Sequence, residues 1–286
     1  KLLSLLLALA LVLCLAACGS KTDDTNTDDT KGDANTENVD LVVFAAASMT
    51  ETLTEIAEMY KEVAPNVNIT YNFDSSGKLL TQISEGADCD LFISAAPKQM
   101  NAMDGSLIDD KDKNPDGLDL IVTDSRIDLL ENKVTLAVPE GNPKGIKDFN
   151  DLAERLKSGE ILLCMGNSDV PVGQYTQKIL AYYELDEEAL AKAGCITYGT
   201  NVKEVTSQVG EGAVDCGVIY KTDAFSAGLT VVDEATKEMC GQVVYPAAAM
   251  KNAPQAEGAK LFLEFLKGTE ASKCFSEVGF TPLATA

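Results

Sequence analysis

Strand-length apolar runs alternate with longer amphipathic stretches through most of the chain, and this order constrains the fold more than any other feature. Between residues 39 and 95 the pattern predicts strand, helix, strand, helix and strand. A β-α-β-α-β order implies a mostly parallel sheet with helices packed on both faces. The predicted strands are Val39–Phe44, Val67–Phe73 and Asp90–Ala95, and the predicted helices are Met49–Val63 and Ser76–Glu85.

The same alternation resumes after a polar stretch and predicts a second α/β unit. A return strand at Val243–Ala249 and a long amphipathic helical stretch at Gln255–Val278 follow it. A chain that builds one unit, crosses to a second and returns forms two lobes with a cleft between them. The second unit is predicted to contain the strands Lys133–Val138, Ile161–Met165, Cys195–Tyr198 and Asp215–Tyr220, and the helices Ile146–Lys157, Gly173–Tyr183 and Val202–Glu211.

Charge and composition exclude several classes of function. The 286 residues carry a formal net charge of −22 and include no histidine. Such an acidic chain repels nucleic acid, and the missing histidine removes the commonest general base and metal ligand. Serine–histidine–aspartate catalysis is therefore excluded, and no nucleic-acid partner is expected.

The N-terminal segment has the features of an export signal. Residues 1–17 combine a basic start, an apolar run and small residues before Cys18. This pattern predicts a lipoprotein signal peptide and lipidation of Cys18, whereas the short run and the absence of a positive stop disfavour a transmembrane anchor. Residues 18–38 are acidic and polar and are expected to form a disordered tether. The mature protein is then held to the outer face of the membrane, or is periplasmic.

Six cysteines remain beyond this segment. Disulfides are permitted outside the cytoplasm, but six cysteines allow 15 pairings, so buried thiols and structural disulfides both stay open. A thiolate metal site is disfavoured because there is no C-x-x-C and no histidine. These residues are Cys89, Cys164, Cys195, Cys216, Cys240 and Cys274.

Four predicted helices begin in segments rich in small or hydroxyl residues, and none of these segments contains arginine. Ligands of open parallel sheets bind where a strand ends and the next helix begins. A helix N-terminus there offers unpaired N–H groups and partial positive charge, which bind an anion without a cationic side chain. Ser48 and Ser76 are candidate donors, although either could simply cap its own helix. The segments are F-A-A-A-S-M-T, F-D-S-S-G-K-L-L, G-N-S-D-V-P-V-G and Y-G-T-N-V-K-E-V.

Six segments carry a family resemblance: F-A-A-A-S-M-T-E-T-L, F-D-S-S-G-K-L-L-T-Q-I, D-L-F-I-S-A, V-P-V-G-Q-Y, D-C-G-V-I-Y-K-T-D-A and E-V-G-F. Together they resemble the molybdate-binding proteins of bacterial ABC importers. The resemblance runs in order from about residue 40 to the end. It implies that Ser48 and Ser76 each give a hydroxyl and an amide to the oxyanion. It further implies backbone amides from Val172 and Val202 and the phenolic hydroxyl of Tyr220.

Three positions qualify the resemblance. Val172 replaces a smaller alanine, which an amide donor tolerates, and Gly77 follows Ser76 where a further serine is often found. Asp74 is a carboxylate beside the expected anion, so we expect it to face away and cap the helix that begins near Ser76.

A site of neutral donors with no histidine should also bind with nearly the same affinity between about pH 6 and 8.

The resemblance implies a two-lobed type II periplasmic-binding-protein fold, each lobe a mostly parallel sheet flanked by helices. We assign residues 39–138 and 241–286 to lobe 1 and residues 139–240 to lobe 2. The expected function is capture of molybdate, and of tungstate, by a monomer without cofactor or catalysis, followed by delivery to an ABC transporter permease. The alternatives are a receptor for sulfate or phosphate and, in a different class, an exported α/β hydrolase or transferase.

Overall fold

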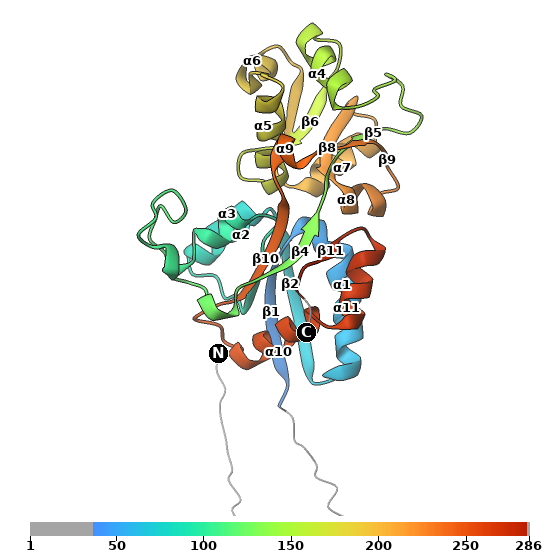
Figure 1. Cartoon of the computed structure of the whole chain (residues 1–286). Helices are drawn as coiled ribbons and strands as arrows, with labels where there is room; N and C mark the ends of the chain where they lie inside the picture. The colour runs from blue at the N-terminus through green and yellow to red at the C-terminus, as the bar shows by residue number, and fades with distance from the viewer. Residues whose placement is uncertain (1–36, 285–286) are drawn as a thin grey trace, which may run out of the picture. The chain divides into compact units, whose positions relative to one another are not determined.

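The computed structural model describes residues 37–284, and these residues form two lobes, each built on one sheet (Figure 1). The strands of lobe 1 are β1 (Val39–Ala46), β2 (Val67–Asp74), β3 (Leu91–Ile93), β4 (Ile127–Asn132), β10 (Val243–Ala249) and β11 (Thr281–Pro282). Those of lobe 2 are β5 (Val134–Val138), β6 (Leu163–Gly166), β7 (Ile196–Gly199), β8 (Cys216–Tyr220) and β9 (Thr230–Glu234). The sheet orders are β11-β4-β10-β3-β1-β2 and β7-β6-β8-β5-β9.

Helices cover both sheets. In lobe 1, the helices Thr50–Val63 and Thr269–Glu277 lie on one side of the sheet, and the helices Ser76–Ser84 and Pro97–Asn101 lie on the other (Figure 1). Lobe 1 carries α1 (Thr50–Val63), α2 (Ser76–Ser84), α3 (Pro97–Asn101), α10 (Ala256–Leu266), α11 (Thr269–Glu277) and the 3-10 turns η1 (Ala47–Met49), η2 (Gly105–Leu107) and η3 (Thr123–Ser125). Lobe 2 carries α4 (Phe149–Ser158), α5 (Pro171–Tyr182), α6 (Glu187–Lys192), α7 (Val202–Gly210), α8 (Lys221–Ser226) and α9 (Lys237–Cys240).

The predicted two-lobed α/β class is confirmed, but antiparallel pairing is commoner than expected. In lobe 1, β1 is parallel to β2 and β3, while β10 is antiparallel to β3 and β4. In lobe 2, β6 is parallel to β7 and β8, while β5 is antiparallel to β8 and β9. These antiparallel strands include β5, by which the chain enters lobe 2, and β10, by which it returns to lobe 1. Neither strand is joined to its parallel neighbours by a crossover helix, so neither has to be parallel to them.

The lobe boundary lies earlier than the sequence suggested. Val134–Val138, which we assigned to lobe 1, is β5 and pairs with β8 and β9 of lobe 2. The chain therefore crosses between Asn132 and Val134, without a loop to mark the crossing. An apolar strand carries no local signal for the sheet that it joins, so the pattern of residues alone misplaced it.

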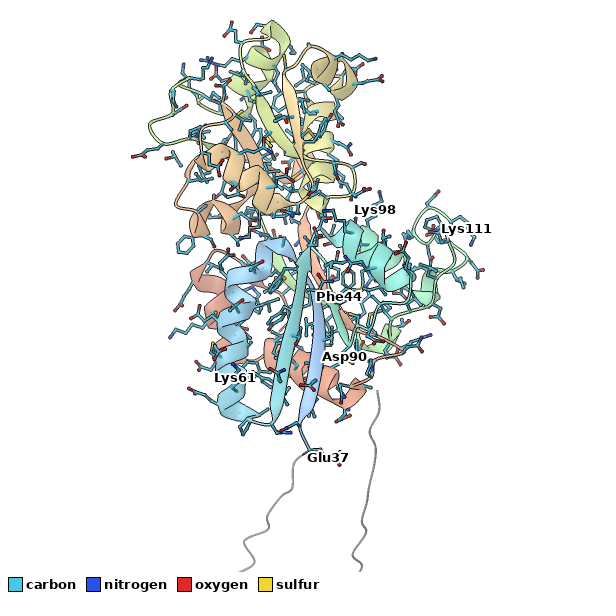
Figure 2. All side chains as sticks on the ribbon, turned by 180° about the vertical axis from the view of Figure 1, so that it is seen from behind. Glu37, Phe44, Lys61, Asp90, Lys98 and Lys111 are labelled. Atoms are coloured by element: carbon cyan, nitrogen blue, oxygen red, sulfur yellow. The ribbon has the colours of Figure 1, made fainter. Side chains whose placement is uncertain are left out.

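Alternation along β1 builds a core on each face of the lobe 1 sheet. Leu41, Val43 and Ala45 are fully buried in a cluster with α1 residues such as Leu53. Phe44 points to the opposite face, toward α2 and α3 (Figure 2), where it is buried in the second cluster. This period-two arrangement is the expected one for a strand covered on both faces. It holds the end of β1, and the residues that follow it, in a fixed position.

Candidate functional site

A small cavity lies where strands of both lobes end. Twelve residues line it, and all five residues predicted to bind the oxyanion are among them. Its volume is only about 10 Å³, far below the roughly 300–1,000 Å³ of pockets for drug-sized ligands. The cavity therefore has no room for a drug-sized ligand and can take only a very small one, such as an ion. Its lining is Ala46, Ala47, Ser48, Asp74, Ser75, Ser76, Ala95, Val170, Pro171, Val172, Val202 and Tyr220.

Ser48 lies in η1, just beyond the end of β1, and only 3% of it is exposed. It is not a helix cap, because neither η1 nor α1 has a side-chain cap at its N-terminus. Its hydroxyl is instead 2.8 Å from the hydroxyl of Tyr245, a fully buried residue of β10. Of the three preceding alanines, Ala46 and Ala47 line the cavity as the sequence indicated, whereas Ala45 lies in the core of lobe 1.

Ser76 is the first residue of α2 and is fully buried. The helix cap is the preceding residue, Ser75, whose side chain accepts from the Lys78 amide. The Ser76 oxygen accepts a hydrogen bond from the Ala95 amide at 3.0 Å. The loop that presents this amide is held by Ser94, whose hydroxyl donates to the Ala96 carbonyl. Capping, the alternative role for Ser48 and Ser76, is thus performed by neither.

Two helix N-termini of lobe 2 complete the lining. Val202 is the first residue of α7, and Val172 follows Pro171 at the start of α5. Amides of a first helical turn have no partner within the helix. The α7 cap, Asn201, accepts from Glu204 and so does not occupy the Val202 amide. α5 has no side-chain cap at all. Both valine amides are therefore placed to donate, together with the positive end of each helix dipole.

Tyr220, at the end of β8, is the residue whose geometry points most directly to a ligand. It is 1% exposed, and its hydroxyl has no hydrogen-bond partner among the described residues. Leaving a buried hydroxyl unpaired costs about 1–3 kcal/mol, so such groups are normally satisfied. Burial raises the pKa of this phenol well above its usual value. It therefore remains a protonated donor at the edge of the cavity.

Asp74 lies along the lining, opposite Ala46 in the register of β1 and β2. Contrary to our expectation, Asp74 is not the N-cap of α2, because Ser75 is the N-cap residue. Its Oδ1 accepts from the Ser75 amide at 2.7 Å and lies 3.4 Å from the Lys78 ammonium. These contacts hold the carboxylate beside the helix start and partly offset its charge. Lys78, whose side chain is 41% exposed, is thus an ion-pair partner of Asp74.

Gly77 explains one departure from the expected pattern. Its Cα lies against the backbone of Asp169 from lobe 2, so a Cβ there would stand 3.0 Å from the Asp169 carbonyl carbon and overlap the carbonyl oxygen. A serine at this position is incompatible with so close an approach of the lobes. Gly173 is required within lobe 2 for a similar reason, because α5 begins directly over the Gly166 carbonyl.

An ion-pair cluster that the sequence did not reveal bridges the lobes beside the cavity. Lys203, next to Val202, lies 2.7 Å from Glu51 of α1 and 3.1 Å from Asp223 of α8. Asp223 is fully buried, and burial raises the pKa of its carboxyl to about 6 despite the nearby lysine. The sequence around Asp223 gives no local indication that this carboxylate is buried, because its burial depends on tertiary packing.

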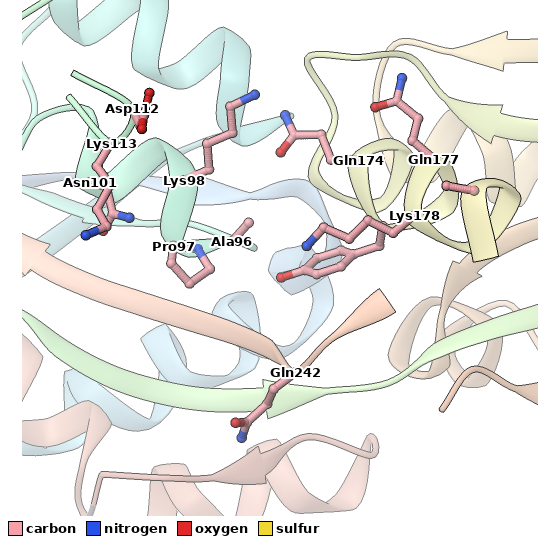
Figure 3. Close-up of a pocket in the computed structure, with 12 residues that line it drawn as sticks. Ala96, Pro97, Lys98, Asn101, Asp112, Lys113, Gln174, Gln177, Lys178 and Gln242 are labelled. Atoms are coloured by element: carbon pink, nitrogen blue, oxygen red, sulfur yellow. The ribbon is translucent and has the colours of Figure 1, made fainter. Parts of the chain in front are cut away.

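A larger hollow of about 600 Å³ borders the cavity. Ala96, which follows the cavity residue Ala95, lines it together with Tyr175 of α5. Figure 3 shows Lys98 from α3 and Lys178 from α5 extending into it from opposite sides. Neither lysine forms an ion pair within residues 37–284. Lys98 and Lys178 thus present cationic groups to this hollow, in a chain of net charge −22.

All six cysteines in the described part of the chain are buried free thiols, which resolves the choice between thiols and disulfides. The same residues contain no cluster of three or more side chains able to hold a metal ion. No helix within 37–284 is long and apolar enough to cross a membrane. The predicted signal peptide, Cys18 and most of the tether lie outside the described residues.

Two α/β lobes with a small cavity of hydrogen-bond donors between them define a two-lobed solute-binding protein. A model of the bacterial extracellular solute-binding protein family matches residues 41–281, and the chain belongs to this family. It is 34% identical over 276 residues to YvgL of Bacillus subtilis, named as an ABC transporter substrate-binding lipoprotein; the match covers 96% of this chain and 95% of that one.

Two further similarities concern molybdate. The chain is 30% identical over 265 residues to the molybdate-binding protein ModA of Escherichia coli, covering 87% of this chain and 92% of that one. A solved substrate-binding domain from Clostridium difficile, assigned to a molybdenum ABC transporter, is 30% identical with a TM-score of 0.60, covering 85% and 99%. The resemblance found in the sequence is confirmed. The protein is an extracellular solute-binding protein of an ABC transporter and not an enzyme.

Proposed function

We propose that this protein captures molybdate, and also tungstate, in the cavity between its lobes and delivers it to the permease of an ABC transporter. The single observation that carries the proposal is the buried, unpartnered hydroxyl of Tyr220 at the edge of a cavity surrounded by helix N-termini. In the proposed complex, Ser48 and Ser76 donate from lobe 1 through hydroxyl and amide. Val172 and Val202 donate amides from lobe 2, and Tyr220 donates its hydroxyl.

The donors also suggest which oxyanions are excluded. A group that can only donate leaves the O–H of a protonated phosphate without an acceptor, unless the Asp74 carboxylate turns inward from its contacts with Ser75 and Lys78 to accept that proton. Sulfate carries no proton near neutral pH but is smaller than molybdate, so donors fixed on two closed lobes cannot all reach it. Each donor left unpaired costs on the order of 1–3 kcal/mol. We therefore expect sulfate and phosphate to bind at least about a hundredfold more weakly than molybdate.

The cellular context is part of the same proposal. We propose that residues 1–17 are a signal peptide, that Cys18 is lipidated, and that residues 18–38 tether a monomer to the outer face of the cell membrane. The composition of this segment supports the proposal, as does the similarity over 96% of the chain to a protein named as a lipoprotein. Delivery to a permease follows from membership of a family of ABC transporter components.

Competition calorimetry with soluble protein beginning near residue 38 tests the ligand. Molybdate is titrated into the protein alone and then in the presence of equal concentrations of sulfate, phosphate or tungstate. The expected result is tight binding of molybdate that only tungstate displaces. Displacement of molybdate by an equal concentration of sulfate would contradict the assignment and favour a sulfate receptor.

A further inference from the structure

Behind Ser48, a chain of hydrogen bonds leads from the crossing between the lobes to the cavity. The Asn132 side-chain amide donates to the Tyr245 hydroxyl at 3.2 Å and to the Thr222 hydroxyl at 2.9 Å. Its carbonyl oxygen accepts from the Lys133 backbone amide at 2.8 Å, which fixes the amide in this orientation. The Tyr245 hydroxyl in turn lies 2.8 Å from Ser48 Oγ.

The number of protons available in this hydrogen-bond network assigns the direction of the bond between Tyr245 and Ser48. A tyrosine hydroxyl has one proton to donate. Asn132 already donates to the Tyr245 oxygen, so the Tyr245 proton needs an acceptor of its own. Among the described residues, Ser48 Oγ lies within hydrogen-bond distance of the Tyr245 hydroxyl and can be that acceptor. If Ser48 donated instead, the buried Tyr245 oxygen would accept from both Asn132 and Ser48, and the Tyr245 proton would have no acceptor. Leaving that proton unpaired in a buried site costs free energy. Tyr245 therefore donates to Ser48.

This direction determines what Ser48 presents to a ligand. One of the two lone pairs of its oxygen accepts on the Tyr245 side, and this favours an orientation in which its own proton points toward the cavity that it lines. Ser76 has the same arrangement, because its oxygen accepts from the Ala95 amide. The two hydroxyls of lobe 1 thus both favour donation toward the cavity.

We propose that Tyr245 is a positioning residue for selectivity: by donating to Ser48 it occupies one of the two acceptor sites of that oxygen and favours donation toward the cavity, so the site discriminates against oxyanions that carry a proton. The proposal rests on the proposed function, because it assumes that an oxyanion binds beside Ser48. Tyr245 itself is fully buried, does not line the cavity and acts only through Ser48. Burial also raises the pKa of this phenol well above its usual value, so its proton remains in place at any pH used for binding.

The test is Tyr245→Phe, which keeps the buried ring and removes only the hydroxyl. Affinities for molybdate, sulfate and phosphate are measured by calorimetry near neutral pH, where only phosphate carries a proton. Loss of one preorganising hydrogen bond should weaken binding of the unprotonated anions by about 2- to 10-fold. Phosphate should bind no more weakly than before, because Ser48 can now accept its proton. The ratio of molybdate to phosphate affinity should therefore fall, whereas equal weakening of all three anions would overturn the proposal.

Two further variants make the result specific. Tyr71→Phe is the matched control, because Tyr71 also donates its hydroxyl, to the Leu53 carbonyl, but does not line the cavity; it should leave all three affinities unchanged. Asp74→Asn removes the carboxylate that borders the cavity, and the effect of Tyr245→Phe should persist in that background. If the relative gain in phosphate affinity disappears in the Asp74→Asn background, Asp74 and not Ser48 is the acceptor, and the proposal is wrong.

The proposed function can fail separately. Should the unaltered protein bind sulfate and not molybdate, the ligand assignment is wrong, while the ratio of sulfate to phosphate still tests Tyr245. Tight molybdate binding with an unchanged ratio in Tyr245→Phe would overturn only the role of Tyr245. A protein that binds none of the three anions would overturn both.

Discussion

The close approach of Gly77 to Asp169 allows a test of whether this arrangement of the lobes is the one that holds the ligand. Gly77→Ala adds a single Cβ that would stand 3.0 Å from the Asp169 carbonyl carbon and overlap its oxygen. Ordinary van der Waals contact requires about 3.5–4.0 Å between carbon atoms. The lobes must therefore separate, or the backbone around Asp169 must shift.

The expected cost follows from the size of this overlap. Forcing an added methyl into a packed contact typically costs about 1–3 kcal/mol, which corresponds to roughly a 5- to 150-fold loss of affinity. Folding should not suffer, because the two residues belong to different lobes and meet only when these are together. Alanine is also the better helix former, so the stability of the ligand-free protein should be unchanged or slightly higher.

Calorimetry with molybdate and thermal unfolding without ligand measure the two quantities. Gly210→Ala is the control, because a Cβ at this α7 residue would meet nothing nearer than Leu229 at 3.7 Å. It should affect neither affinity nor closure. Wild-type affinity in Gly77→Ala would refute the reasoning, since the bound form could not then contain this contact.

Three further predictions concern the site and its borders. Tyr220→Phe removes one hydrogen bond to a charged ligand, worth about 1.5–3 kcal/mol, so molybdate affinity measured by calorimetry should fall roughly ten- to a hundredfold; an unchanged affinity would exclude Tyr220 as a donor. The Asp223 pKa of about 6 exceeds its unfolded value, so this group makes the protein less stable as pH rises from about 4 to 6, and chemical denaturation should show about 1 kcal/mol more stability at about pH 5 than at about pH 7.5. Asp223→Asn should remove this contribution, and an identical pH profile in the variant would contradict it. Glu51→Gln breaks only the half-exposed bridge to Lys203, so affinity should fall by less than about fivefold and the difference should shrink in high salt; a large loss that persists in salt would show another role for Glu51.

Local pattern was sufficient for the elements that follow one another in β-α-β order. The strand Val67–Phe73 and the helix at Val202, for example, begin where the apolar periodicity and turn residues place them. The structure also gathers Ser48, Ser76, Val172, Val202 and Tyr220 around one cavity. That assembly came from the family resemblance, because neither composition nor spacing indicates which N-termini face each other across two lobes.

Features that depend on partners distant in the sequence escaped prediction. The strands Ile127–Asn132 and Thr230–Glu234 were missed because charged and polar residues interrupt their apolar patterns. The helical stretch expected over Gln255–Val278 is divided at Gly268, which caps α11. Tyr245 received no role, since its contact with Ser48 spans 197 positions. The expectation of pH-independent binding likewise did not include Asp223, whose burial is set by tertiary packing.

The place of β10 in the first sheet determines the order in which the molecule can fold. Every strand of lobe 2 lies in one continuous stretch, from Val134 to Glu234. Lobe 1, by contrast, needs β10 between β3 and β4, and this strand begins only at Val243. A chain synthesised from its N-terminus therefore has all the strands of the later lobe before the earlier one can close its sheet, and β3 keeps an unpaired edge during that interval. The C-terminal segment thus decides when the newly made protein is first able to bind.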